Sequence, residues 1–206
     1  GDDMVALGFS GDGATSQGDF HAALNFAAVF KAPVVFVVQN NQWAISVPCS
    51  RQTASATFAQ KASAYGMPGV RVDGNDALAV FQVVHSATER ARRGEGPTLV
   101  ECLTYRIGAH SSSDDPTRYR DEAEVDCWRA RDPIARLGAH LRHTGQLTTE
   151  GEQALDAALE AEIAAAIRAT EAQPAVSREG LMDDVYAARP PHLESQRDEL
   201  LRYPRA

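Results

Sequence analysis

Two short polar turns follow two apolar runs near the start of the chain. Gly11-Asp12-Gly13 comes after the run that ends at Phe9, and Asn40-Asn41 comes after the run from Val34 to Val38. Glycines let backbone N–H groups approach an anion closely, and a helix that begins there favours a phosphate at its N-terminus. Carboxylate and amide oxygens are ligands that Mg²⁺ prefers. Taken singly, each sequence is also what an ordinary turn requires.

One helix and one strand are expected between these turns, and they decide whether the turns can act together. The spacer, residues 14–39, is 26 residues long, with Thr15 or Ser16 as the candidate N-cap of the helix. A helix between two parallel strands makes a right-handed crossover, so both turns emerge at the carboxyl edge of one sheet. Asp12 and Asn41 are therefore predicted to ligate one Mg²⁺ ion beside a bound phosphate.

The same alternation of strands and helices continues along the chain. Further strands are expected at residues 69–72 and 98–104, and helices at 56–65, 76–93, 122–130, 133–143, 149–172 and 191–201. This order predicts an α/β fold, a mostly parallel sheet with helices on both faces, followed by C-terminal helices. We expect one domain at residues 1–143 and a helical extension at 144–206, with Met67, Phe81 and Val84 in the core.

Composition and charge exclude several classes of protein. The chain has 206 residues, 44% of them hydrophobic, and a net charge of −8 without a basic segment, which argues against nucleic-acid binding. Its longest apolar run, Pro33 to Val38, is far below the roughly 18 residues of a membrane span. Three cysteines without a C-x-x-C pair indicate isolated thiols. We expect the back part of a longer protein, located in a bacterial cytoplasm or a mitochondrial matrix.

The spacing of the two turns is the signature by which thiamine diphosphate enzymes are known. The chain resembles, over nearly its whole length, the alpha subunit of the decarboxylating first component of 2-oxo acid dehydrogenase complexes, of the branched-chain type or the similar bacterial pyruvate type. The resemblance lies in the segments GDGATSQGDFHAALNFAAVFKAPVVFVVQNNQWAIS, RVDGNDALAV and YRIGAHSSSDDPTRYR. It implies a thiamine diphosphate-binding fold, thiamine diphosphate and Mg²⁺ as cofactors, and oxidative decarboxylation with acyl transfer to a lipoyl group.

The resemblance also assigns roles at the two turns. Asp12 and Asn41 would each give the metal a side-chain oxygen, and Trp43 would give its main-chain carbonyl. Gln39 stands where the mammalian branched-chain enzyme has an Arg, so it offers the diphosphate only neutral hydrogen bonds. The residues expected to contact the cofactor are Gly11, Gly13, Ala14, Gln39 and His110.

A third turn, the loop from Arg106 to Arg120, carries the expected catalytic residue. In the family, the His that matches His110 contacts the diphosphate and assists acyl transfer to lipoate. The hydroxyl that matches Ser111 is phosphorylated in mitochondrial relatives. We expect the loop arginines to order the loop by neutralising Asp114 and Asp115.

The partners implied by the resemblance are a beta subunit in an α₂β₂ assembly, the lipoyl domain of the acyltransferase component and a small 2-oxo acid. The beta subunit supplies the glutamate that activates the cofactor, so this chain alone is expected to be inactive. Pyruvate and branched-chain 2-oxo acids both stay open as substrates, and the SSSDDPTRYR segment favours the latter. Alternatives are another thiamine diphosphate enzyme, transketolase-like or acetolactate-synthase-like, and a truncated cofactor-binding module. A dinucleotide site is discounted because no G-x-G-x-x-G follows the first strand.

Overall fold

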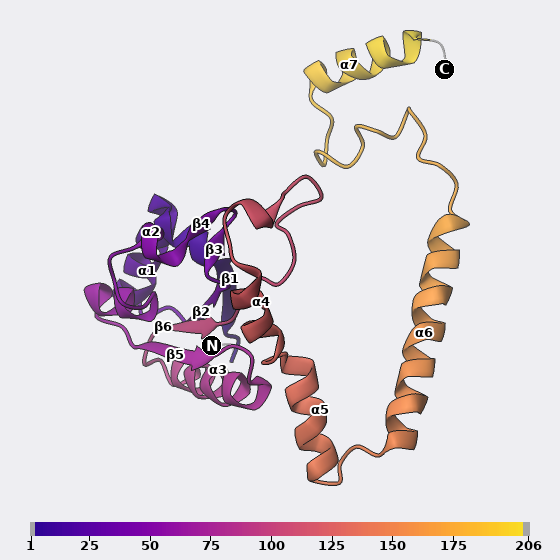
Figure 1. Ribbon diagram of the computed structural model, residues 1–206. Coiled ribbons are helices and arrows are strands. Elements are labelled where there is room, and N and C mark those ends of the chain that lie inside the picture. The colour runs from indigo at the N-terminus through magenta and orange to yellow at the C-terminus, as the bar shows by residue number, and fades with distance from the viewer. Residues whose placement is uncertain (1–2, 204–206) are drawn as a thin grey trace. The chain divides into compact units, whose positions relative to one another are not determined.

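A computed structural model describes residues 3–203 of the chain, and the chain divides into two units between Leu147 and Thr148 (Figure 1). The first unit contains every strand found in that range, and the second is helical. The division lies four residues beyond the expected boundary at residue 143, and the roles expected for the two domains stay predictions.

A four-stranded parallel sheet is the centre of the first unit. Its order is β1-β2-β6-β5, and the strands are β1 (Ala6–Gly11), β2 (Val34–Asn40), β5 (Gly69–Asp73) and β6 (Thr98–Leu103). The two middle strands, VVFVVQN and TLVECL, are largely apolar, as is usual for strands buried on both faces. The register pairs Gly11 with Gln39, so the first two polar turns leave the sheet side by side.

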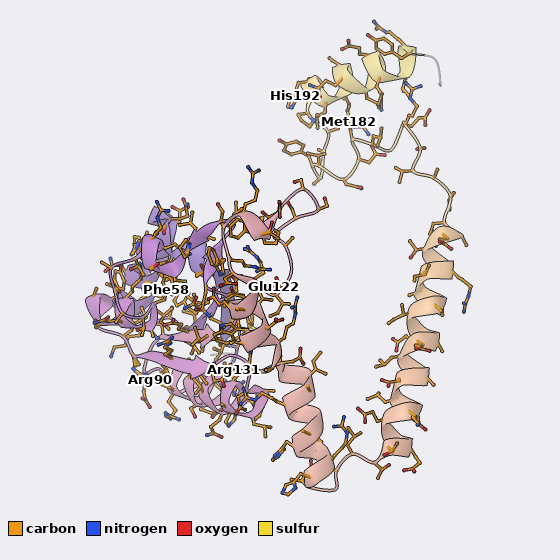
Figure 2. All side chains as sticks on the ribbon, viewed as in Figure 1. Phe58, Arg90, Glu122, Arg131, Met182 and His192 are labelled. Carbon is orange, nitrogen blue, oxygen red and sulfur yellow. The ribbon has the colours of Figure 1, made fainter. Side chains whose placement is uncertain are left out.

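Helices cover both faces of the sheet, which confirms the predicted fold class. On one face, α1 (Gly18–Val29) and the 3-10 helix η2 (Ala59–Tyr65) pack on the sheet around Leu24, Phe58 and Leu99. On the other face, α3 (Ala77–Arg92) packs through Ala87. Figure 2 shows Phe58 within the crowded side chains of this unit. Successive residues of β2 alternate between the two layers, as the pleat requires.

Short elements connect the sheet to the loops at its carboxyl edge. The first strand continues into the 3-10 helix η1 (Asp12–Ser16). The second strand leads into a small hairpin of β3 (Trp43–Ala44) and β4 (Val47–Pro48), and then into α2 (Cys49–Gln52).

The chain after β6 adds a third small core beside the sheet. The elements here are η3 (Pro116–Arg118), α4 (Glu122–Arg129) and α5 (Pro133–His143). Trp43, Tyr105 and Val125 form the core of this cluster. The second unit contains α6 (Thr149–Glu171) and α7 (Pro191–Arg202). No helix among residues 3–203 is long and apolar enough to cross a lipid bilayer.

Three local expectations were wrong. Thr15 and Ser16 do not cap α1, because η1 takes up both residues and Gln17 becomes the N-cap, without a side-chain hydrogen bond. Residues 56–65 form a shorter 3-10 helix instead of an α-helix. Phe81 is 68% exposed because it lines an open cavity beside Phe9 of β1 and Val37 of β2, whereas Met67 is buried as expected.

Candidate functional site

Asp12 is a buried carboxylate at the carboxyl end of β1. Its side chain is 1% exposed, its Oδ2 atom accepts a hydrogen bond of 2.7 Å from Nε2 of Gln52, and Sγ of Cys49 lies 3.8 Å from the same oxygen. Within the described residues, no Lys or Arg forms an ion pair with it. A buried negative charge with only neutral donors around it is costly unless a cation compensates it. The carboxylate therefore suits a bound metal ion.

The loop after β2 presents the two other expected metal ligands. The Oδ1 atom of Asn41 accepts a hydrogen bond of 3.1 Å from the main-chain N–H of Trp43. The carbonyl of Trp43 accepts one of 3.2 Å from Nη1 of Arg106. Each of these oxygens has two lone pairs, so each keeps one for a metal. Gln42 and Ile45 have positive φ angles of 70° and 54°, which makes the loop tightly bent.

The two turns touch at Gly13. A Cβ atom placed on Gly13 would lie 2.8 Å from Cβ of Ala44, so only glycine permits this approach. Gly11, by contrast, has no other part of the chain within 4 Å of a Cβ in that position. Ala14 and Gln39 are exposed at the same edge of the sheet. The structure thus brings the expected cofactor-binding turns together and leaves open space at Gly11.

Sequence reasoning missed a buried polar network beneath these turns. Nδ2 of Asn40 donates to Oε1 of Glu101 at 2.7 Å, and the main-chain N–H of Ala59 donates to Oε2 at 2.9 Å. Glu101 is 1% exposed, and Nε of Arg71 lies 3.7 Å from its carboxylate. The signal was a glutamate within TLVECL, an otherwise apolar strand. This network anchors the first residue of the Asn pair and thereby positions the second.

Cys49 joins this network to Asp12. Its Sγ donates to Oδ1 of Asn40 at 3.1 Å and lies 3.8 Å from Oδ2 of Asp12. Burial, reinforced by the neighbouring negative charge of Asp12, raises the pKa of the Cys49 thiol to about 12. The thiol is therefore protonated at neutral pH and acts as a hydrogen-bond donor. Sequence reasoning gave Cys49 no such role.

His110 lies in an exposed loop, and a hydrogen bond fixes its main chain but not its ring. Its main-chain N–H donates to Oδ2 of Asp114 at 2.8 Å, and no partner of its ring was found within residues 3–203. The Tyr119 hydroxyl donates to the same Oδ2 at 2.6 Å. Nη2 of Arg106 in turn donates to the Tyr119 hydroxyl at 2.8 Å. Because Nη1 of Arg106 bonds the Trp43 carbonyl, one arginine links the His110 loop to the metal-ligand loop.

The expectation that the loop arginines neutralise Asp114 and Asp115 is met in part: after the hydrogen bonds from Tyr119 and His110, the charge of Arg106 helps to lower the pKa of Asp114. Arg106 also acts through the Tyr119 hydroxyl, and Arg120 donates instead to the main-chain carbonyls of Arg106 and Ile107. The hydrogen bond from Tyr119, supported by the N–H of His110, holds the pKa of Asp114 below its ordinary value.

The donor set at the edge of the sheet is mixed. It comprises one carboxylate, one amide and one main-chain carbonyl. Among residues 3–203 there is no cluster of three or more His, Cys, Asp or Glu side chains that could hold a metal ion. An all-oxygen set with a single carboxylate suits Mg²⁺, which shares its ligands with substrate phosphates and water, and does not suit a structural Zn²⁺ ion.

Comparison with known proteins agrees with this geometry. The family model described as "Dehydrogenase E1 component" matches residues 1–179. The chain is 50% identical, over 199 residues, to the 3-methyl-2-oxobutanoate dehydrogenase subunit alpha of Mycobacterium tuberculosis (strain ATCC 25618 / H37Rv), covering 97% of this chain and 54% of the relative. It is 46% identical, over 197 residues, to the pyruvate dehydrogenase E1 component subunit alpha of Staphylococcus aureus (strain N315), covering 95% and 53%. The chain thus spans about half the length of these curated relatives. It belongs to the dehydrogenase E1 component family, as the resemblance implied.

Proposed function

We propose that the protein is the alpha subunit of a thiamine diphosphate-dependent 2-oxo acid dehydrogenase that works with a beta subunit. The observation that carries this proposal is the buried Asp12, which has only neutral donors and lies where two parallel strands end. The spacing of its turn from the Asn pair and the membership of the family support the same function.

In this proposal, the residues of the two turns bind the cofactor. Asp12, Asn41 and the carbonyl of Trp43 hold Mg²⁺, and the backbone at Gly11, Gly13 and Ala14 faces the diphosphate, with Gln39 beside it. When bound, thiamine diphosphate supplies the carbanion-stabilising chemistry of decarboxylation. His110 contacts the diphosphate, and its exposed loop gives an approaching lipoyl group access to the ring.

We propose a branched-chain 2-oxo acid as the preferred substrate and the lipoyl domain of an acyltransferase as the acyl acceptor. The relative from M. tuberculosis is named for 3-methyl-2-oxobutanoate and the relative from S. aureus for pyruvate. Assaying the full-length protein with its beta subunit on both acids, with lipoamide as acceptor, tests this choice. Turnover without any acyl transfer to lipoamide would favour a transketolase-like or acetolactate-synthase-like enzyme. Cofactor binding without turnover would favour a binding module.

The metal assignment is tested by Asp12→Asn in the full-length protein. This change keeps the shape of the side chain but removes the charge that faces the metal. We expect Mg²⁺-dependent binding of thiamine diphosphate to weaken by at least about 100-fold, because loss of mere outer-shell partners already costs 10–100-fold. Isothermal titration calorimetry with and without Mg²⁺ measures the effect. Asp156→Asn, on the exposed surface of α6, is the matched control, and equal affinities for the two variants would contradict the proposal.

A further inference from the structure

Gln52, the last residue of α2, has a side chain fixed by two acceptors. Its Nε2 atom donates to Oδ2 of Asp12 at 2.7 Å and to the main-chain carbonyl of Val47 at 3.0 Å. One acceptor belongs to η1 and the other to β4, so the amide joins the two turns of the proposed cofactor site. Both amide hydrogens are used, and the carboxamide group is therefore held in a single orientation.

The hydrogen bonds of Asp12 are divided unevenly between its two oxygens. Oδ2 accepts a hydrogen bond from Gln52 and has the Sγ atom of Cys49 3.8 Å away, whereas Oδ1 accepts no hydrogen bond from any residue within 3–203. The donors on Oδ2 are neutral. A Lys or Arg in the position of Gln52 would compensate the negative charge and compete with a metal ion, whereas an amide orients the carboxylate and leaves its charge available.

In this orientation the side-chain carbonyl oxygen of Gln52, Oε1, is buried and has no hydrogen-bond partner among the described residues. Rotating the amide by half a turn would place Oε1 against Oδ2 of Asp12, so that two acceptors would face each other. A buried polar atom without a partner needs an explanation, and the carboxylate of Asp12 provides one.

We propose that Gln52 is a positioning residue for the metal ion of the cofactor site. It binds Oδ2 of Asp12 and so reserves Oδ1 as the oxygen that ligates the ion. This inference rests on the proposed function, because it needs Asp12 to be a metal ligand. Hydrogen-bonded partners of ligating carboxylates generally tune metal affinity in this way.

The test replaces Gln52 by Met, which has a similar length and no hydrogen-bonding amide, in the full-length protein with its beta subunit. Mn²⁺ serves as the probe, and electron paramagnetic resonance titration with saturating thiamine diphosphate gives its dissociation constant. We expect Gln52→Met to weaken Mn²⁺ binding by about 10–100-fold. The midpoint of thermal unfolding in EDTA is measured alongside, because losing the donor to the buried Asp12 lowers stability, an effect that removal of the unpartnered Oε1 offsets only in part. The matched control is Gln82→Met at an exposed position of α3.

A second variant keeps the test decisive if Gln52→Met does not fold. Gln52→Asn retains an amide but shortens its reach by one methylene, and it should also weaken Mn²⁺ binding while Gln82→Met does not. Wild-type affinity in a folded Gln52 variant, or a lower unfolding midpoint in EDTA with unchanged Mn²⁺ affinity, would overturn the positioning role alone. Failure of the wild-type protein to bind Mn²⁺ with thiamine diphosphate would overturn the proposed function itself.

Discussion

Asp114 and Tyr119 form a hydrogen-bonded pair whose two groups titrate in opposite directions. The hydrogen bond from Tyr119 lowers the pKa of the Asp114 carboxyl, while burial and the same bond raise the pKa of the Tyr119 hydroxyl. Both directions follow from a phenol that donates to a carboxylate. Asp114 accepts hydrogen bonds from the main-chain N–H of His110 and from the Tyr119 hydroxyl. The protonation state of Asp114 therefore determines whether these bonds hold the His110 loop in place.

The hydrogen bonds between Asp114, Tyr119 and His110 are expected to depend on pH. Because the pKa of Asp114 is lower in the folded protein, its stabilising contribution is present above the unfolded pKa and is lost as the pH falls through the folded pKa. Tyr119→Phe removes the main cause of the shift, so Asp114 should titrate at a higher pH and the loop should be released earlier on acidification. Carboxyl ¹³C NMR titration measures this, with Tyr186→Phe in the second unit as control. Identical Asp114 titrations in the two variants would refute the assignment.

At the scale of elements, Gly69 lets η2 pack tightly against β5. A Cβ atom placed on Gly69, the first residue of β5, would lie 2.0 Å from the carbonyl oxygen of Ala59 and 2.9 Å from Cβ of Ala62. Backbone atoms cannot move aside as a flexible side chain can. Glycine at this position therefore sets how closely η2 covers the sheet, and the same helix donates the Ala59 N–H to Glu101.

Gly69→Ala is accordingly expected to destabilise the protein. Forcing a methyl group into this contact should lower the free energy of unfolding by about 1–3 kcal/mol or more, because overpacked cores must shift their backbone. Gly18→Ala is the control, since open space surrounds its Cβ position at the start of α1 and alanine favours a helix. Urea denaturation of both variants measures the difference, and equal stabilities would show that η2 adjusts without cost.

The sequence predicted the elements better than the contacts between them. Periodicity located every long helix and each strand of the large sheet to within a few residues, including α3, whose N-cap is Asp76. Phe81 was misplaced because helical spacing does not tell which apolar residues of α3 are covered: it lines a cavity beside Phe9 and Val37 and stays exposed. The network of Asn40, Glu101 and Ala59 joins residues 42 and 61 positions apart. Spacing along a chain carries no signal for such pairings, and only the fold brings them together.

At the scale of the whole molecule, the first unit exposes several large apolar side chains on β1 and α1. Phe9, Phe26, Val29 and Phe30 are 60–72% exposed, and β1 is an edge strand of the sheet. Phe26 and Phe30, whose rings stack on each other, form exposed apolar surface of the kind that another surface commonly covers. Under the proposed function, the remaining length seen in the relatives and the beta subunit are the candidates for covering it.

The last prediction is that this chain alone catalyses no decarboxylation. Under the proposed function, a beta subunit supplies the glutamate that activates the cofactor, so the metal and diphosphate ligands of this chain cannot complete the reaction. We expect no detectable CO₂ release from pyruvate or 3-methyl-2-oxobutanoate by the 206-residue chain, and release once the full-length protein is assembled with its beta subunit. Circular dichroism of the chain provides the control, because inactivity has meaning only if the chain is folded. Turnover by the folded chain alone, at a rate similar to that of the assembly, would show that one chain contains the whole active site.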